Sequence, residues 1–469
     1  MLFSSMEFLW LFLPIVLIVN RLLPRKANNV WLLLASLFFY AFGEPVYILL
    51  MLCSIFLNYI SGIIMDPLQN GKRKLALAIT VVVNLGLLGY FKYFDFFVNL
   101  LNLLSGREVI AVRNIALPIG ISFYTFQILS YIIDLYRREI KVQKNPLNLA
   151  LYISFFPQLI AGPIVNYRDI EYDLTNRTVT LEKTAYGVKR FIYGLSKKVL
   201  FANTFALTAD KILELPLLDV PSSYLWFAYL LYALQIYFDF SGYSDMAIGL
   251  GKIFGFTFLE NFNYPYLSSS ITEFWRRWHI SLSTWFRNYL YIPLGGNRKG
   301  LLRTCLNLLI VFVCTGLWHG AGLNFLFWGL WHGFFLIIER FRLKKLPKNK
   351  AVRVVRHVYT LIVVYFGWVF FRAGSITRAF STIVRMFSFS SGNDAIYFEA
   401  FGGTAVVLVM AIAIFLSGPL QELFPKFKRK LYDETSTGYL QIAVLAVMFF
   451  LSIVSLVSDS YNPFIYFRF

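Results

Sequence analysis

Cysteine, histidine and charge are scarce in this chain. Its 469 residues include three cysteines and four histidines, and 15% are charged. Cys53, Cys305 and Cys314 lie inside apolar stretches and show no Cys-x-x-Cys or Cys/His ligand spacing. The sequence therefore supports neither a disulfide framework nor a zinc site, and we expect no metal and no bound cofactor.

Common catalytic motifs and internal repeats are missing as well. The chain contains no Gly-x-Ser-x-Gly elbow, Walker loop, dinucleotide fingerprint or His-Glu-x-x-His. No hydrophilic stretch is long enough for a separate soluble domain, and no repeat of fixed period is visible. We predict one domain over residues 1–469, with scaffold helices in 1–146, a catalytic core in 147–340 and C-terminal helices in 341–469.

Apolar residues dominate instead, at 58% of the chain with 19% aromatic. Since about 20 apolar residues cross the hydrocarbon core as a helix, we expect roughly 11 to 13 spans in an all-α, multi-pass membrane protein. The first segment lacks a basic start and a cleavage site, so we expect it to be retained. The clearest apolar runs are Phe8–Val19, Ile79–Tyr90, Leu225–Tyr237, Leu306–Trp318, Ala405–Leu416 and Ile442–Val457.

The net charge of +19 comes from short basic clusters between the apolar runs. This pattern indicates membrane topology and a lipid bilayer partner rather than nucleic acid. With the clusters facing the cytoplasm, the N-terminus lies outside and one apolar segment between Leu147 and Arg340 fails to cross. The clusters are Arg21–Lys26, Lys72–Lys74, Arg137–Lys144, Arg340–Arg356 and Lys426–Lys430.

Polar residues interrupt the apolar pattern between Leu147 and Trp331. Burying such groups in hydrocarbon costs free energy unless they face a cavity or one another, so we expect the functional site here. Phe156–Ile164 contains two prolines and a glycine, and it is the strongest candidate for a re-entrant element.

The segment Phe274–Tyr289 is predicted to be an interfacial helix. At about 100° per residue its aromatic side chains share one face, and Arg276, Arg277 and Arg287 lie opposite. His279 falls at the margin of the aromatic face, where it either points into a cavity or hydrogen-bonds a lipid headgroup.

His319 lies in Thr315–Gly322, where an apolar run ends between glycines. An ionisable residue within a span is a functional candidate, and a neutral imidazole can accept a proton near neutral pH. Trp318 precedes it. His332 repeats the Trp-His-Gly pattern, but on one continuous helix it would lie roughly 20 Å from His319, so we assign it a supporting role.

Asp239 and Asp245 interrupt another predicted helix within Tyr237–Met246. Six residues apart, they do not lie one above the other on a straight helix. Two interpretations stay open, namely that they polarise a site or that they form a structural network with arginines such as Arg276.

Several of these stretches together resemble the membrane-bound O-acyltransferase family, in its alginate O-acetyltransferase-like branch. The chain's opening Met1–Ser5 and closing Asn462–Phe469 also resemble that branch. The matching motifs are Phe156–Pro163, Phe238–Asp245, Phe274–Trp285, Tyr291–Asn297, Gly316–Gly320 and Trp331–Gly333.

The resemblance implies a fold and a pair of catalytic residues. The family has a ring of helices with re-entrant and interfacial elements around a central tunnel and funnel. It pairs an intramembrane histidine with an Asn, Asp or His some tens of residues earlier, which corresponds to His319 and His279 here. His319 would be the general base on an acceptor hydroxyl, and His279 would orient the acyl group or stabilise the oxyanion. An acyl-enzyme on Cys314 is disfavoured because that residue lies about 140° around the helix from His319.

The resemblance also implies the partners. Acetyl-CoA would be the cytoplasmic donor, and an extracytoplasmic polysaccharide or an envelope-side relay protein would be the acceptor, in a bacterial cytoplasmic (inner) membrane. Two alternatives remain. One is D-alanyl transfer to teichoic acid, and the other is a non-enzymatic polysaccharide transporter with broken helices.

Overall fold

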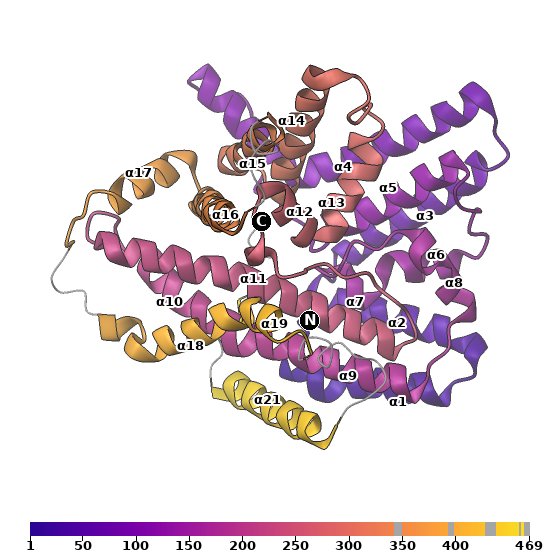
Figure 1. Ribbon diagram of the computed structural model, residues 1–469. Helices are drawn as coiled ribbons and strands as arrows, with labels where there is room; N and C mark the ends of the chain where they lie inside the picture. Colours follow the sequence, from indigo (N-terminus) through magenta and orange to yellow (C-terminus); the bar gives the residue numbers. More distant parts are fainter. Residues whose placement is uncertain (342–348, 393–397, 427–437, 459–460, 464–469) are drawn as a thin grey trace. The chain divides into compact units, whose positions relative to one another are not determined.

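The structure, a computed structural model, describes residues 1–341, 349–392, 398–426, 438–458 and 461–463. All regular secondary structure in these ranges is helical, as the sequence predicts (Figure 1). Residues 342–348 and 427–430 of the basic clusters, and 464–469 of the closing motif, lie outside the described residues.

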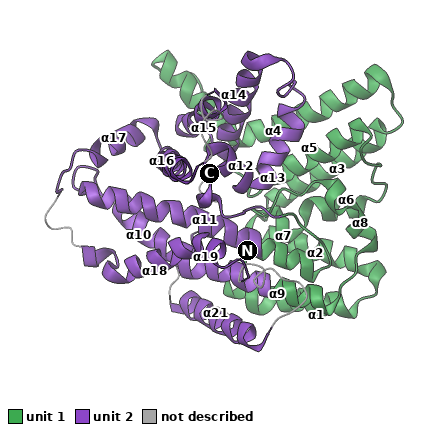
Figure 2. Cartoon of the chain, viewed as in Figure 1, with its two compact units in different colours: residues 1–188, 246–259 green, residues 189–245, 260–469 purple. Residues whose placement is uncertain are grey.

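The chain forms two compact units (Figure 2). The first comprises Met1–Val188 with Met246–Leu259, and the second comprises Lys189–Asp245 with Glu260–Phe469. All the site residues predicted from the sequence belong to the second unit. Helices α9 (Leu181–Ser196) and α11 (Ser222–Ile253) contribute residues to both units. The single-domain organisation stays a prediction.

The first unit is built from helices of very different length. Apolar runs form its long members, of which α4 has 36 residues. Its elements are η1 (Phe8–Phe12), α1 (Leu13–Leu22), α2 (Arg25–Gly43), α3 (Tyr47–Met65), α4 (Asn70–Ser105), α5 (Ile121–Arg137), α6 (Pro146–Ser154), α7 (Phe156–Leu159) and α8 (Tyr167–Asn176).

The segment Phe156–Ile164, predicted as a re-entrant element, begins with the four-residue helix α7. Helices α6 and α7 have nine and four residues and are separated at Phe155, so neither is long enough to cross the hydrocarbon core. Pro157 lies in the first turn of α7, where its missing N–H costs no helical hydrogen bond. Whether the segment re-enters one membrane face stays a prediction.

Arg73 joins three helix ends in the first unit. Its buried guanidinium donates to the carbonyls of Met65 (3.0 Å) and Asp66 (2.8 Å) at the end of α3. It also donates to Leu135 (2.6 Å) and Tyr136 (3.2 Å) near the end of α5. These carbonyls have no partner within their own helices, and a cation there also complements the helix dipole. The ends of α3 and α5 therefore lie together beside the start of α4.

The second unit contains the remaining elements. They are η2 (Lys197–Ala202), α10 (Asn203–Leu213), η3 (Pro265–Leu267), α12 (Ile271–Arg277), α13 (Ile280–Phe286), η4 (Arg287–Tyr291), α14 (Gly300–His319), α15 (Leu323–Phe341), α16 (Lys350–Arg372), α17 (Ile376–Met386), η6 (Phe398–Phe401), α18 (Gly403–Leu416), α19 (Pro419–Leu423) and α21 (Tyr439–Ser458). Helices α14 and α15 form an antiparallel pair, and α12 packs against α15 and α16.

Five helices among the described residues are long and apolar enough to cross a membrane, namely α3, α4, α14, α16 and α21. The stretches Phe8–Leu22 and Gly403–Leu416 are shorter apolar helices. Only 11% of the most apolar part of α21 is buried within the protein, so its surface suits lipid. Other apolar runs counted in the sequence form helices that are shorter or that carry buried polar groups, as α11 does. The central tunnel implied by the resemblance stays a prediction.

Candidate functional site

The α14–α15 hairpin determines where His319 lies. Gly316 and Gly329 face the opposite helix so closely that a Cβ at Gly316 would lie 2.3 Å from the Phe325 carbonyl oxygen, and one at Gly329 would lie 2.1 Å from that of Phe312. Small residues permit this approach of two backbones inside a membrane protein. Helix α14 ends at His319, so the glycines before and after it serve helix packing.

Aromatic rings surround the His319 imidazole. Its centroid lies 5.0 Å from Trp318, 5.0 Å from Trp328 and 5.1 Å from Phe371, all in edge-to-face geometry. The residue is 4% exposed. The ring is therefore held in a largely dry environment built by α14, α15 and α16.

His332 lies on the other side of Trp328. The two ring centroids are 5.1 Å apart, and His332 also contacts Trp275 at 5.3 Å. A Cβ at Gly367 of α16 would lie 2.8 Å from His332 Nε2. The chain breaks between α14 and α15, so the continuous helix on which we placed His332 far from His319 is not present. The tight packing agrees with a supporting role, which stays a prediction.

The predicted continuous helix over Phe274–Tyr289 is wrong. Helix α12 ends at Arg277 and α13 begins at Ile280, because His279 has a left-handed backbone with φ +43°. The extended segment before α12 pairs with the break, since Asn263 N–H donates to the Arg277 carbonyl (2.9 Å) and Ile280 N–H donates to the Asn261 carbonyl (3.0 Å). These nonlocal bonds satisfy backbone groups that a helix break leaves without partners.

The break buries His279 completely. Its ring meets Phe240 of α11 edge-on at 4.6 Å and lies 5.8 Å from Trp318. Trp318 also contacts His319, so one indole lies against both histidines proposed as catalytic. The structure thus places His279 against the indole that directly precedes His319, although the two histidines are forty positions apart in the sequence.

Asp239 and Asp245 form buried ion pairs in the second unit. Lys198 Nζ lies 2.9 Å from Asp239 Oδ1, with both side chains at most 3% exposed. Asp245 is bound by Arg190 (2.7 Å) and Lys197 (2.6 Å). The two aspartates are therefore paired with cations of α9 and η2 rather than with Arg276, which favours the structural network over direct catalysis.

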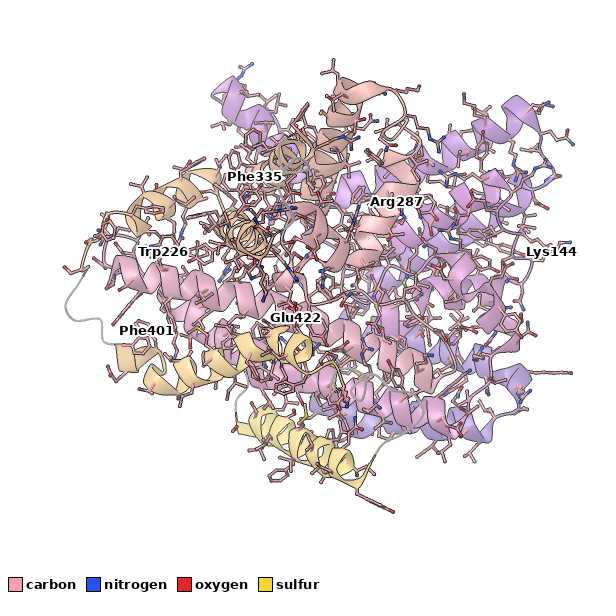
Figure 3. The ribbon with its side chains drawn as sticks, in the orientation of Figure 1. Lys144, Trp226, Arg287, Phe335, Phe401 and Glu422 are labelled. Carbon is pink, nitrogen blue, oxygen red and sulfur yellow. The ribbon has the colours of Figure 1, made fainter. Side chains whose placement is uncertain are left out.

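Arg276 is exposed on α12 at the rim of a mostly apolar pocket of about 200 Å³. Arg277 pairs with Glu273 at 2.8 Å, and Arg287, labelled in Figure 3, is exposed in η4. Since no continuous helix is present, the predicted opposition of the arginines and one aromatic face does not apply, and Arg276 lines the pocket together with Trp275 and Phe286. The pocket is lined by Thr272, Trp275, Arg276, Leu282, Ser283, Phe286, Val311, Phe312, Thr315 and Leu336.

Glu339 of α15 anchors the start of α12. Its carboxylate accepts hydrogen bonds from the backbone N–H groups of Ile271 and Thr272, the latter at 2.9 Å. The Ser270 hydroxyl accepts from Glu273 N–H at 3.0 Å and completes the cap. A carboxylate at a helix N-terminus satisfies otherwise unpaired donors, so α15 fixes the short helix that leads to His279.

Sequence reasoning missed Asn261 and the three cations Arg190, Lys197 and Lys198. Lysines beside the apolar run of α10 and η2 were a usable signal, because an intramembrane lysine requires a partner. Asn261 gave no such signal, since it lies in an extended segment without periodicity. No group of three or more His, Cys, Asp or Glu in the described ranges could hold a metal ion.

Comparison with known proteins relates this chain to acyltransferases. The sequence profile of the MBOAT, membrane-bound O-acyltransferase family, matches residues 133–383. The probable alginate O-acetylase AlgI of Azotobacter vinelandii is 41% identical over the whole of both chains. The peptidoglycan O-acetyltransferase of Helicobacter pylori is 35% identical over 82% of this chain and 80% of its own. The teichoic acid D-alanyltransferase of Bacillus subtilis is 29% identical over 55% of this chain and 69% of its own.

Proposed function

The chain belongs to the membrane-bound O-acyltransferase family, and we propose that it moves an acetyl group from cytoplasmic acetyl-CoA to an extracytoplasmic polysaccharide. The acceptor would be alginate or another cell-envelope polymer, reached directly or through an envelope-side relay protein. The proposed location is the bacterial cytoplasmic (inner) membrane, where a multi-pass enzyme has access to both compartments.

One observation carries the proposed chemistry, namely that two buried histidines lie against the same indole. A buried imidazole within an aromatic enclosure can accept a proton without competition from bulk water. His319 is proposed as the general base because it ends α14 inside this enclosure. Trp318 and His332 hold the enclosure together, and the ion pairs of Asp239 and Asp245 fix α11 beside it.

The proposed reaction is a single acyl transfer. The oxygen of the acceptor hydroxyl attacks the thioester carbonyl carbon, so a C–O bond forms and the C–S bond breaks. His319 takes the hydroxyl proton and returns it to the departing thiolate, which leaves as free coenzyme A. General base catalysis of this kind contributes about 10²- to 10⁴-fold to a rate.

Acetyl is favoured over D-alanyl because the acetylase relatives match more of the chain at higher identity. Two of these relatives are named for alginate and peptidoglycan, which supports a polysaccharide acceptor here. Exposed cations such as Arg276 and Arg287 suit an anionic donor or polymer.

The test compares His319→Gln with His357→Gln. The second variant makes the same substitution at a histidine whose Nδ1 donates to the Ser268 carbonyl at 2.9 Å, outside the enclosure. Membrane vesicles carrying each variant receive acetyl-CoA with a labelled acetyl group, and coenzyme A release and polymer acetylation are measured. We expect His319→Gln to lose both signals by about 100-fold or more and His357→Gln to keep them.

Thermal unfolding of the two purified variants in detergent verifies that both are folded and equally stable. Full acetylation by His319→Gln would remove that residue from the chemistry. Transfer of D-alanine but not acetyl by the wild-type chain would select the sister reaction, and flux of polysaccharide without thioester cleavage would select the transporter.

A further inference from the structure

Asn261 occupies a fully buried position beside the α12–α13 break. It belongs to the extended segment that hydrogen-bonds to the break, and its side chain reaches three groups of the same region. The amide Oδ1 lies 3.2 Å from Ser281 N, 2.9 Å from Ser281 Oγ and 3.2 Å from His279 Nδ1. The amide Nδ2 lies 3.1 Å from Ser244 Oγ.

The orientation of the Asn261 amide follows from one of these contacts. A backbone N–H is only a donor, so the amide atom that faces Ser281 N must be the oxygen. The nitrogen then faces the Ser244 hydroxyl, which can accept. The orientation of the amide does not depend on which histidine nitrogen carries a proton.

The tautomer of His279 follows in turn. Because Nδ1 faces an oxygen that has no proton to offer, the neutral ring is stabilised when Nδ1 carries the hydrogen and donates it. Burial lowers the pKa of His279 well below its usual value, so the ring is neutral at pH 7. Nε2 then has a lone pair, and no described residue hydrogen-bonds to it.

We propose that Asn261 is a positioning residue that holds His279 in the Nδ1-protonated tautomer, so that Nε2 serves the reaction as a hydrogen-bond acceptor. The inference rests on the proposed acetyl transfer and refines it. An acceptor at Nε2 can bind the O–H of a hydroxyl next to the attacking one on the sugar, which leaves the attacking O–H to His319, whereas Nε2 cannot donate to a developing oxyanion. His279 therefore orients the nucleophile, and the oxyanion role considered from the sequence does not fall to it.

The first test reads the tautomer directly. Solid-state NMR of the wild-type protein with ¹⁵N-labelled histidine distinguishes protonated from unprotonated ring nitrogens, and the His279 signals are assigned by their loss in His279→Gln. We expect Nδ1 protonated and Nε2 unprotonated at pH 7. A protonated Nε2 would overturn the proposal whatever the activity of the enzyme.

The second test uses matched variants of one segment. Asn261→Leu removes the acceptor, Asn261→Asp keeps an oxygen toward Nδ1, and Asn263→Leu alters an exposed side chain two residues away. We expect kcat to fall about 100-fold in Asn261→Leu with little change in KM, and Asn263→Leu to match the wild type.

Asn261→Asp should recover most of that loss with an altered pH profile. A carboxylate favours the charged imidazolium, so the acid limb of the kcat profile should move to higher pH. The described neighbours of the ring, Asn261, Ser281, Phe240 and Trp318, do not titrate in this range. An unshifted profile in Asn261→Asp, or full activity in Asn261→Leu, would refute the positioning role.

These outcomes separate the inference from the proposed function. Absence of acetyl transfer by the wild type would refute the function, while the NMR measurement would still report the tautomer. Acetyl transfer that depends on His279 but not on Asn261 would refute only the inference.

Discussion

Lys198 and Asp239 illustrate what a single buried charge costs in this protein. Both side chains are almost fully buried, and Lys198 also donates to the Pro463 carbonyl. Removing one partner of a buried pair leaves a charge without compensation, which typically costs about 3 to 5 kcal/mol, whereas replacing both by apolar residues is often neutral.

We therefore expect Asp239→Leu to destabilise the protein by about 3 to 5 kcal/mol and the double variant Lys198→Met/Asp239→Leu to recover most of this loss. Chemical unfolding in detergent measures both free energies. If the single and the double variants are equally destabilised, the ion pair contributes to stability by itself, and its effect is not limited to each charge compensating the burial of the other.

At the scale of elements, the α14–α15 hairpin depends on close contact between two backbones. Gly329 and Gly316 leave no space for a side chain, since the nearest atoms are main-chain atoms that cannot rotate away. The hairpin carries His319 at the end of one helix and Trp328 in the other, so its geometry determines the aromatic enclosure.

Gly329→Ala should accordingly separate the helices, lower the free energy of unfolding by about 1 to 3 kcal/mol and reduce acetyl transfer. Gly86→Ala on α4 is the matched control, because a Cβ there meets no atom within 4 Å. Thermal unfolding and vesicle activity of the two variants give the comparison. Wild-type behaviour of Gly329→Ala would contradict this account of the hairpin.

At the scale of the whole molecule, contacts in the first unit support the topology expected from the basic clusters. Arg73 joins the ends of α3 and α5 beside Lys72–Lys74, so two predicted cytoplasmic clusters lie together. At the opposite end of α3, the Tyr47 hydroxyl donates to the Ala116 carbonyl at 3.0 Å. A membrane-spanning α3 would place the loops around this contact at the membrane face opposite the basic clusters.

We expect a cysteine introduced by Glu108→Cys to react with an impermeant thiol reagent from outside intact cells. One introduced by Lys72→Cys should react only after the membrane is permeabilised. Both changes are made after Cys53, Cys305 and Cys314 are replaced by serine, which removes the native thiols. The reverse pattern of labelling would place the N-terminus inside.

Sequence patterns were informative wherever a residue's role depends on its local neighbours. Apolar runs predicted helices, and the prolines of Phe156–Ile164 predicted a segment too short and broken to span, which contains only the four-residue helix α7. Sequence patterns failed at Phe274–Tyr289. The helical period of the side chains continues through His279 there, but the helical backbone is interrupted at that residue. The break depends on backbone hydrogen bonds with Asn261, whose carbonyl accepts from Ile280, and with Asn263, whose N–H donates to Arg277. Both asparagines are remote in sequence and show no period.

The sequence by itself determined that this is an all-helical, multi-pass membrane protein with candidate catalytic residues at His279 and His319, because hydrophobic length and isolated polar groups are local properties. Only the tertiary structure decided that these two histidines share Trp318, that Asp239 and Asp245 pair with lysine and arginine of α9 and η2, and that Asn261 faces His279. Those relations join residues on different helices, and the packing of the helices, rather than any local propensity, brings them within contact distance.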